Sequence, residues 1–366
     1  MLAINAGSSS VKCALFTAEV EPRPLARDML DGAVSSCVPR LLAWIDQQTE
    51  AVAVAAIGHR IVHGGPDYDE PRRITRGVLE TLRRLIPFAP NHLPDEISLV
   101  EALDRHRPGI SQIACFDTAF HADLPDIARR LPIPGIYDAQ GVRRYGFHGL
   151  SYAFLVQELE RMAGPPAAAK RLILAHLGNG SSLAAVHRGR SVDTTMAFTP
   201  IGGVVMSTRS GDLDPGVVTY LARSERLSAD QVENLLSQRA GLLGISGKSG
   251  DMRALLADEG NDPACRLAVA AYVYGIRKAI GALAAALGGL DTLVFSGGIG
   301  EHSPVIRARI CEGLTFLGME IDPNSNEATA PIISTAASRA AVRVIPTDEE
   351  LMIARAAVRV LDRGRR

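Results

Sequence analysis

The chain has 366 residues, of which 47% are hydrophobic, and its 39 Lys and Arg residues nearly balance its 40 Asp and Glu residues. This length is sufficient for two domains, each with a core of its own. The even balance of charge leaves no strong basic field for nucleic acid or an anionic membrane, so neither is an expected partner.

The distribution of apolar residues and cysteines argues against a membrane-spanning protein and a disulfide-rich protein. Charged residues and glycines interrupt the apolar stretches before any of them approaches the ~20 residues that a membrane span requires. Met1 directly precedes the first predicted strand, so no signal peptide is expected. The five cysteines include no Cys-x-x-Cys pair, which argues against a disulfide framework and a structural zinc site. These features predict a protein of the reducing cytoplasm.

The first predicted element is a hairpin, with strands over 2–4 and 11–16 joined by a small polar loop. Gly7 and the serines at 8–10 would let a phosphate lie close to backbone N–H groups, and Lys12 would add a positive charge. An ordinary Gly/Ser turn is the alternative interpretation.

A similar hairpin recurs over 172–186, where the turn His176-Leu-Gly-Asn-Gly180 separates two apolar runs. Two similar hairpins far apart in the chain indicate two similar halves, each with one phosphate-binding turn. A nucleotide is expected between the halves.

The segment between the hairpins is predicted to contain helices over 34–48, 75–85 and 97–105 and strands over 51–57 and 110–116. The proline-rich loop 89–94 is expected to lack regular structure. Arg60 follows the first of these strands beside a Gly-Gly turn, where it could bind an anion or cap a carbonyl. His59 and His63 are interpreted as structural, because no third metal ligand accompanies them. Asp117 follows the second strand, where open α/β sheets place their chemistry, although a helix N-cap would also explain it.

The middle of the chain contains two further candidate residues. Residues 122–145 are rich in proline and are expected to cross between the halves. His148 lies between glycines and could approach a ligand, although an isolated histidine is more often structural. A helix is expected over 152–162. Arg209, in the polar loop 193–215, could present its guanidinium to anionic oxygens or belong to a surface ion-pair cluster.

The segment 241–253 is close to a P-loop in composition, but Leu242 stands where the P-loop pattern requires glycine. A P-loop is therefore rejected. A long Ala-rich helix is predicted over 267–287, followed by a buried strand over 293–295.

Glycines at 297–300 follow that strand and would let an adenosine lie against the backbone, at the amino end of a helix that starts at Pro304. The last predicted elements are a strand over 342–345 and a helix over 351–361. Together the elements predict an α/β protein.

Eight short motifs in this chain resemble those of the acetate and propionate kinase family, within the acetate/sugar kinase, heat-shock 70 and actin superfamily. They are Asn5-Ala-Gly-Ser-Ser-Ser-Val-Lys12, Gly58-His-Arg-Ile-Val-His-Gly-Gly65, Phe116-Asp-Thr-Ala-Phe-His121, Tyr145-Gly-Phe-His-Gly149, His176-Leu-Gly-Asn-Gly180, Thr208-Arg-Ser-Gly-Asp212, Gly297-Gly-Ile-Gly-Glu301 and Thr347-Asp-Glu-Glu350. One such motif is weakly specific, whereas eight in family order are strongly so.

The resemblance implies two duplicated ribonuclease-H-like halves, the actin-like ATPase fold, with a nucleotide cleft between them. The N-terminal half would span 1–121 and be joined by the C-terminal helix 351–366. The C-terminal half, 122–350, would carry the nucleotide site and the interface of a homodimer. The implied activity is the reversible phosphorylation of acetate by ATP, with Mg²⁺ or Mn²⁺ as cofactor. Kinases of propionate or another short acid, a sugar kinase and a non-catalytic nucleotide switch are the alternatives.

The resemblance also implies a role for each site residue. The catalytic residues would be Asp117, His148 and Arg209, the metal ligands Asn5 and Glu349, and the acid-binding residues Arg60, Val62, Phe147 and Pro200. The nucleotide-binding residues would be Lys12, His176, Leu177, Gly178, Asn179, Gly180, Asp251, Met252, Arg253, Gly298, Ile299, Gly300, Glu301 and His302.

The chemistry of phosphoryl transfer to a carboxylate fits these roles and alters the one expected for Asp117. A carboxylic acid with a pKa below ~5 is already ionised at pH 7 and needs no general base. Asp117 is therefore expected to hold the metal, its water or an arginine. The chain departs from the family at Asn91-His92-Leu93, where Leu-His-Asn is usual, and at Leu150 and His302, where threonine and asparagine are usual. These departures leave the preferred acid open.

Overall fold

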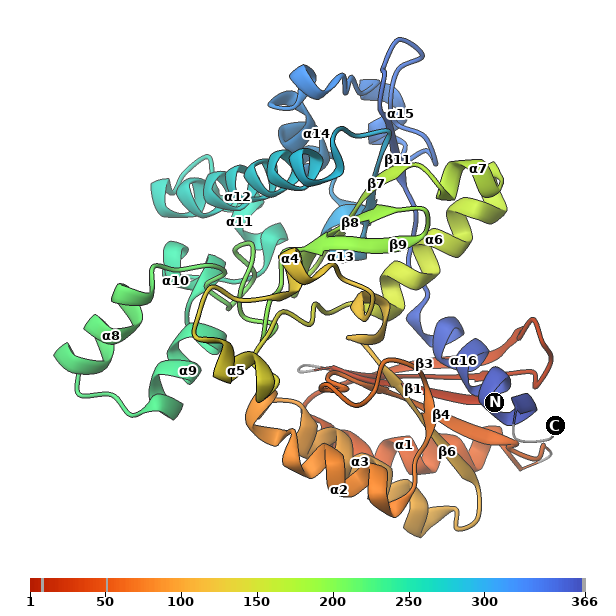
Figure 1. Cartoon of the computed structure of the whole chain (residues 1–366). Coiled ribbons are helices and arrows are strands. Elements are labelled where there is room, and N and C mark those ends of the chain that lie inside the picture. The colour runs from red at the N-terminus through yellow and green to blue at the C-terminus, as the bar shows by residue number, and fades with distance from the viewer. Residues whose placement is uncertain (8–9, 51, 364–366) are drawn as a thin grey trace. The chain divides into compact units, whose positions relative to one another are not determined.

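The structure is a computed structural model and describes residues 1–7, 10–50 and 52–363 (Figure 1). Two serines of the first predicted loop, Ser8 and Ser9, and the start of a predicted strand, Ala51, lie outside the described residues. The chain divides into two compact units. Unit 1 comprises Met1–Ala122, Phe147–Phe154 and Asp348–Arg366, and unit 2 comprises Asp123–Gly146 and Leu155–Thr347. The segment Phe147–Phe154 thus groups with unit 1, whereas the division made from the sequence places it in the second half.

Unit 1 is built on a sheet with the strand order β3-β2-β1-β4-β6-β5. Its strands are β1 (Leu2–Ala6), β2 (Ser10–Phe16), β3 (Pro24–Asp31), β4 (Ala56–Ile61), β5 (Arg72–Arg73) and β6 (Ser111–Phe116). The prediction missed β3, because its side chains are mostly exposed and form no apolar run. The strand predicted over 51–57 was wrong in position, since β4 ends at Ile61 and contains Arg60.

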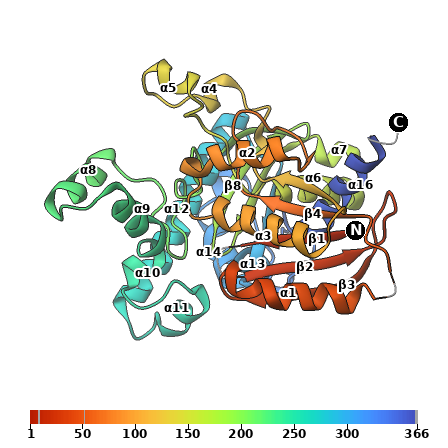
Figure 2. The ribbon, with the colours of Figure 1, turned by 90° about the horizontal axis from the view of Figure 1, so that it is seen from below.

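Helices cover both faces of this sheet. They are α1 (Val34–Gln48), α2 (Arg76–Arg84), η1 (Ile86–Phe88), α3 (Leu93–His106), η2 (Ala119–His121), the first residues of α6 (Gly149–Ala163), and α16 (Glu349–Arg363). α1 runs along β2 and β3 in Figure 2 and packs with α3 on the apolar face that carries Leu2 and Ile4. α16 covers the other face, where a Cβ on Gly58 would lie only 2.4 Å from the Ile353 side chain. The start of α16 lies near the end of β1, because the Asn5 side chain hydrogen-bonds to that of Glu349.

Unit 2 repeats the same plan, with the strand order β11-β10-β7-β8-β9. Its strands are β7 (Arg171–Leu177), β8 (Ser181–His187), β9 (Arg190–Thr194), β10 (Thr292–Ser296) and β11 (Ala341–Val344). Each unit contains an antiparallel hairpin, β1-β2 in unit 1 and β7-β8 in unit 2. The first strand of each hairpin also pairs in parallel with another strand, β1 with β4 and β7 with β10. The two predicted hairpins therefore occupy equivalent positions, and the predicted duplication is confirmed.

The helices of unit 2 are mostly short. They are α4 (Asp126–Arg129), α5 (Gly135–Ala139), the rest of α6, α7 (Pro165–Ala168), α8 (Pro215–Ser224), α9 (Ala229–Gln238), α10 (Gly241–Ser246), α11 (Met252–Asp258), α12 (Pro263–Leu287), α13 (Gly297–His302), α14 (Pro304–Glu312), η3 (Thr315–Leu317) and α15 (Pro323–Glu327). The glycines at 297–300, predicted to lie between a strand and a helix that starts at Pro304, form the start of α13, and the predicted helix from Pro304 is α14.

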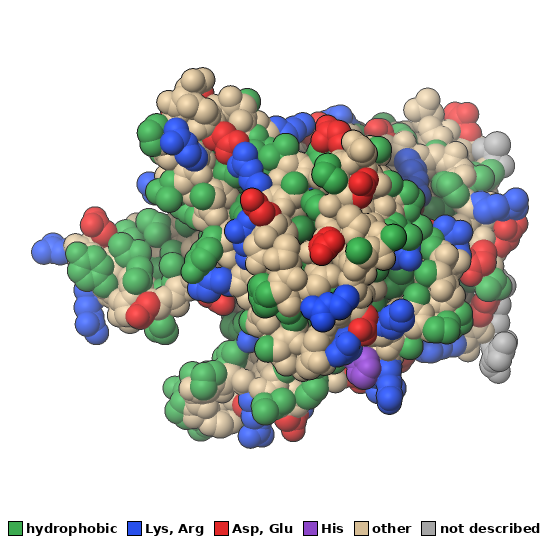
Figure 3. Space-filling model, turned by 90° about the horizontal axis from the view of Figure 1, so that it is seen from above, with side chains coloured by type: hydrophobic (Ala, Val, Ile, Leu, Met, Phe, Trp, Pro, Cys, Tyr) green, Lys and Arg blue, Asp and Glu red, His purple; other side chains and the backbone are tan. Residues whose placement is uncertain are grey.

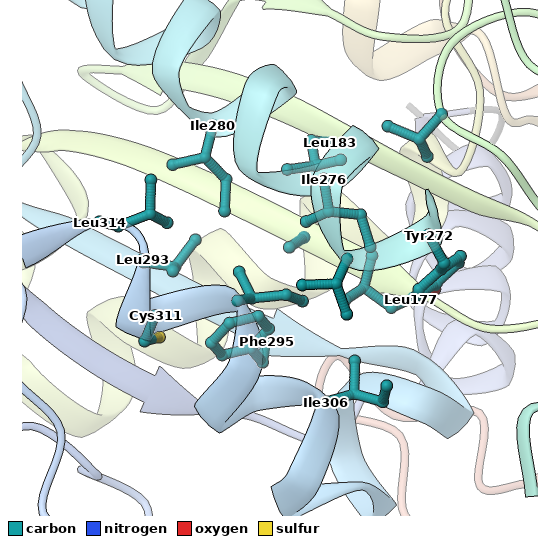
Figure 4. Packing of buried hydrophobic residues seen from close by; sticks show 14 of the residues in the cluster. Leu177, Leu183, Tyr272, Ile276, Ile280, Leu293, Phe295, Ile306, Cys311 and Leu314 are labelled. Atoms are coloured by element: carbon teal, nitrogen blue, oxygen red, sulfur yellow. The ribbon is translucent and has the colours of Figure 1, made fainter. Parts of the chain in front are cut away.

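The predicted Ala-rich helix is α12, and it forms the centre of the unit 2 core. In Figure 4 its residues Ile276 and Ile280 lie on the side of the core opposite Leu293 and Phe295, and Tyr272 lies beside Leu177. Among the described residues this helix alone is long and apolar enough to cross a membrane, with a mean hydropathy of 1.3 in its most apolar window. Because 44% of that window is buried and core helices of soluble proteins share these properties, the signal is weak.

The buried histidine of β4 predicts an acid-sensitive contribution to the stability of unit 1. His59 Nε2 lies 2.6 Å from Gln112 Oε1, and burial lowers the pKa of His59 from 6.5 to about 4. Between these values the unfolded chain binds a proton that the folded chain does not, so this contribution is complete above pH 6.5 and is lost as the pH falls toward 4.

We expect His59→Gln, which keeps a donor toward Gln112, to flatten the decrease in the free energy of unfolding between pH 7 and pH 5. The fluorescence of Trp44, the single tryptophan, measures this in urea, because Trp44 packs against the core of unit 1. The same pH dependence in both proteins would show that His59 is protonated in the folded state.

Candidate active site

The end of β1 carries a cluster of polar side chains with the start of α16. Asn5 Nδ2 donates hydrogen bonds of 2.8 Å to both Glu349 Oε2 and Glu350 Oε1. Lys12 stands opposite Asn5 in the β1-β2 hairpin and is exposed. The structure thus brings together the two predicted metal ligands, Asn5 and Glu349. The prediction missed Glu350, for which the only signal was its place beside Glu349.

A buried ion pair joins the ends of β4 and β6. Arg60 Nε and Nη2 donate to Asp117 Oδ2 at 2.9 and 2.5 Å, and Nη1 donates to the Ala6 carbonyl at 2.9 Å. The Asp117 side chain is fully buried and that of Arg60 is 13% exposed. Both interpretations of Arg60 thus apply in part, since the guanidinium binds a carbonyl as well as a carboxylate.

The second oxygen of Asp117 remains available. Oδ1 is buried and has no hydrogen-bond partner among the described residues. Burial raises the pKa of Asp117 to about 6, because it outweighs the opposing charge of Arg60. Glu349 also contributes to this rise, so its carboxylate lies within electrostatic range of Asp117.

The side-chain oxygens at this end of the sheet test whether the site could bind the Mg²⁺ that the family resemblance implies. Magnesium prefers oxygen ligands and is usually bound by one or two carboxylates together with substrate phosphates. The buried Oδ1 of Asp117 without a partner, the carboxylate of Glu349 and the amide of Asn5 supply such oxygens. The residues of unit 1 therefore fit Mg²⁺.

Backbone geometry holds His148 beside this ion pair. His148 has φ +60°, a left-handed conformation that non-glycine residues adopt rarely and that concentrates at functional sites. Gly149 N–H donates to the Asp117 carbonyl at 2.9 Å, and a Cβ at Gly149 would lie 2.1 Å from that oxygen. Only glycine therefore fits at position 149, where α6 begins. Phe147 is buried, and its carbonyl accepts from His121 Nε2.

In unit 2 the β7-β8 turn lies beside the start of α13. Residues 176–180 end β7 and form the turn, in which Gly178 N–H donates to the Gly180 carbonyl at 3.0 Å. A Cβ on Gly178 would lie 3.7 Å from the Gly298 nitrogen, and a Cβ on Gly297 would lie 2.8 Å from the Leu177 carbonyl. The predicted phosphate turn and the predicted adenosine segment are therefore neighbours.

Two side chains of α13 and α14 hold this arrangement. Glu301 Oε1 accepts from the Gly297 and Thr347 N–H groups at 2.8 and 3.1 Å. The fully buried Arg307 donates from Nη1 to the carbonyls of Gly300 and Glu301, both at 2.9 Å. Glu301, a predicted nucleotide ligand, therefore shapes the backbone, and the prediction missed Arg307, whose helical sequence context gives no signal.

The remaining residues of this segment differ in exposure. Ile299 packs against the core of unit 2, and His302 is exposed. Asp251 caps α11 and pairs with the exposed Arg253 at 2.8 Å, while the Met252 side chain is buried. Met252 can thus reach a nucleotide only through its backbone.

Arg209 lies in the loop between β9 and α8. Its Nη1 donates to the Pro200 carbonyl at 3.2 Å, so the loop brings these two predicted residues together. Gly241 supports the loop from α10, since a Cβ there would lie 2.2 Å from the Met206 carbonyl and 2.6 Å from the Arg209 carbonyl.

Lys248 of the P-loop-like segment binds carboxylates. Its Nζ lies 2.5 Å from Asp262 and 3.1 Å from Asp258. These acids and Cys265 form a group with the spacing of metal ligands, but the lysine already compensates their charge.

Comparison with known proteins identifies the family. A model of the acetokinase family matches residues 32–355. The acetate kinase of Rhodopseudomonas palustris (strain TIE-1) is 43% identical over 100% of this chain and 99% of its own. The crystal structure of Porphyromonas gingivalis acetate kinase has a TM-score of 0.86 and 34% identity, covering 98% of this chain and 99% of its own. A propionate kinase from Francisella tularensis subsp. tularensis SCHU S4 has a TM-score of 0.87 and 32% identity, covering 97% and 98%.

These matches extend along nearly the whole chain and confirm both the recognised family and the predicted actin-like ATPase fold. The chain therefore belongs to the acetokinase family and is a kinase that transfers phosphate to a carboxylate.

Proposed function

We propose that this chain transfers the γ-phosphoryl group of ATP to acetate, reversibly, and yields acetyl phosphate and ADP. The arrangement of Arg60 carries the proposal. Of its five N–H donors, three serve Asp117 and the Ala6 carbonyl, which leaves two for a substrate carboxylate. A partly buried guanidinium that already has a carboxylate partner is suited to bind a second anion in a fixed orientation.

The proposed transfer forms a bond between an acetate oxygen and the γ-phosphorus, and breaks the bond from that phosphorus to the β-γ bridging oxygen. Since acetate is already ionised, no residue needs to remove a proton. The residues instead position two anions and neutralise charge as the transition state develops. We assign acid binding to Arg60, Val62 and Phe147 in unit 1 and to Pro200 in unit 2. We assign stabilisation of the transferring group to His148, Arg209 and Lys12.

A divalent cation is part of this proposal. We assign it to Asn5, Asp117 and Glu349, as the oxygens of these side chains support. When bound, Mg²⁺ neutralises phosphate charge. Asp117 additionally fixes the fork of Arg60 through Oδ2.

We assign the nucleotide to unit 2. The β7-β8 turn, residues 176–180, would hold the phosphates through its backbone N–H groups. Residues 298–302 and 251–253 would surround the adenosine. The contact between Gly178 and the start of α13 supports a joint role for the first two segments.

The choice of acid depends on the segment before α3. This helix begins at Leu93, so the expectation of an irregular loop over 89–94 was wrong at its end. The Leu93 side chain is fully buried, whereas Asn91 is exposed. This supports a shifted loop in which Leu93 supplies the apolar volume that a leucine at position 91 supplies in relatives.

We therefore expect Asn91→Leu to leave the KM for acetate within about twofold, and Leu93→Ala to reduce the discrimination between acetate and butyrate, since a methylene in an apolar pocket is worth ~1–3 kcal/mol. Steady-state kinetics with acetate, propionate and butyrate measure both effects. Because Leu93 is buried, its variant is assayed well below its own Tm. A large gain in acetate affinity from Asn91→Leu would instead place Asn91 at the acid.

Hydroxylamine trapping of the acyl phosphate formed from ATP and acetate tests the proposed function. We expect acetohydroxamate in proportion to enzyme and time. Wild-type protein that forms no hydroxamate from acetate, propionate or butyrate would contradict the proposal.

We also propose a cytoplasmic homodimer with its interface in unit 2. Large apolar side chains are exposed on this unit, among them Tyr220 of α8 and Leu267 and Tyr274 of α12, which supports an interface there. Acidic and basic side chains are interspersed on the face seen in Figure 3, which suits small-molecule substrates better than nucleic acid.

A further inference from the structure

An acidic side chain occupies the buried face of α3. The buried positions of this helix include Leu93, Ile97, Val100 and Leu103, which follow the helical period. Glu96 lies on the same face and is only 3% exposed. A carboxyl group at such a position is costly unless hydrogen bonds compensate it, so its contacts indicate its role.

The contacts of Glu96 are with the end of β4. The ladder between β4 and β6 ends at Ile61, whose carbonyl accepts from Asp117 N–H. Val62 N–H is the next amide, and it donates to both carboxyl oxygens of Glu96, at 3.2 and 3.1 Å. The side chain thus replaces a strand as the acceptor for the first amide beyond the ladder.

Glu96 also lies within electrostatic range of Arg60. Burial alone would lower the pKa of the Arg60 guanidinium, yet acidic neighbours raise it. They are Asp117, Glu349 and Glu96, in order of decreasing effect. Burial raises the pKa of Glu96 to about 8, although the charge of Arg60 and the Val62 hydrogen bond oppose this rise, so Glu96 carries less negative charge near pH 7 than an exposed glutamate.

We propose that Glu96 is a positioning residue for the acid substrate, because its carboxyl group holds the Val62 amide and thereby fixes the strand end that carries Arg60. This inference rests on the proposed function, in which Val62 and Arg60 form part of the acid site. In this role Glu96 acts through the Val62 amide rather than by contact with the acid or the nucleotide.

Kinetics of two Glu96 variants test the proposal in the full chain. Glu96→Leu removes the acceptor, and loss of a buried hydrogen bond predicts a rise of about tenfold in the KM for acetate, with kcat and the KM for ATP within about threefold of wild type. Glu96→Gln keeps an oxygen for the Val62 amide and should restore the acetate KM to within about threefold. Asp95→Leu removes an exposed acid from the same turn without touching the Val62 amide; it is the matched control and should leave the acetate KM within about twofold of wild type. If Glu96→Leu does not fold, Glu96→Asp replaces it, since its carboxyl is one methylene too short for the Val62 amide.

Deuterium exchange of the peptide that contains Val62 tests the contact without any activity. We expect faster exchange in Glu96→Leu than in wild type and Glu96→Gln. An unchanged acetate KM, an equal rise in both KM values, or unchanged exchange would overturn the role of Glu96. Wild-type protein that forms no acyl phosphate would contradict the proposed function, and in that case the exchange result alone decides whether Glu96 holds the strand end.

Discussion

Replacing Arg209 by alanine is expected to lower kcat by about 10²-fold or more, with little change in ATP binding, because removal of one donor to a developing charge costs about that factor. The structure limits the side effects of this change. The Arg209 side chain donates to the Pro200 carbonyl, whereas the loop itself is held by backbone contacts with Met206 and Gly241 that alanine leaves in place. The catalytic effect should therefore be separable from the conformation of the loop.

Steady-state kinetics and ADP titration of Arg209→Ala measure this effect. Arg223→Ala removes an exposed arginine from α8 of the same unit and serves as the control. A loss of ADP affinity as large as the loss of kcat would assign Arg209 to nucleotide binding or to structure.

Replacing Arg60 by alanine should act mainly on the acid. A hydrogen bond to a charged group contributes ~1.5–3 kcal/mol and ~1.4 kcal/mol is a factor of ten, so loss of two bonds to the carboxylate predicts a rise of about 10²-fold or more in the acetate KM. The change also leaves Asp117 buried without its cation, which raises the pKa of Asp117 further above about 6. We therefore expect a smaller fall in kcat at pH 7 that weakens as the pH rises.

Arg60→Lys separates charge from geometry. Lysine retains the charge but cannot form the fork to Asp117, so its acetate KM should lie between those of wild type and Arg60→Ala. Arg76→Ala, an exposed position on α2, is the control. Equal and mild effects of Arg60→Ala and Arg209→Ala on every parameter would indicate that both arginines are structural.

The elements with a regular apolar pattern could be predicted from the sequence. α1 has the predicted bounds because Val34, Cys37, Leu41 and Ile45 repeat at helical spacing. β3 could not be predicted, because it is held by pairing with β2 and buries little more than Leu30. A strand shows an apolar pattern only where its side chains are buried, so an exposed edge strand has almost no such pattern in its sequence.

The residues of the candidate site also differ in how far they could be predicted from the sequence. Side chains that belong to motifs, such as Arg60 and Asp117, could be named from the sequence, and an arginine was one of the partners expected for Asp117, but the sequence did not show that this arginine is Arg60. Glu96 and Arg307 were missed because their partners are set by the fold. Arg307 binds Asn326 as well as carbonyls of α13, and no local pattern connects these positions. A charged residue on an apolar helical face was the available signal for Glu96.

The path of oxygen tests the transfer of phosphate to a carboxylate most directly. Acetate labelled with ¹⁸O in both carboxylate oxygens is incubated with ATP and enzyme, and the product is cleaved with hydroxylamine, which attacks the carbonyl carbon and releases phosphate with the bridging oxygen. Attack of the acetate oxygen on the γ-phosphorus predicts one ¹⁸O atom in each released phosphate and ADP as the nucleotide product. Released phosphate without ¹⁸O, or ¹⁸O found in AMP, would contradict this reaction.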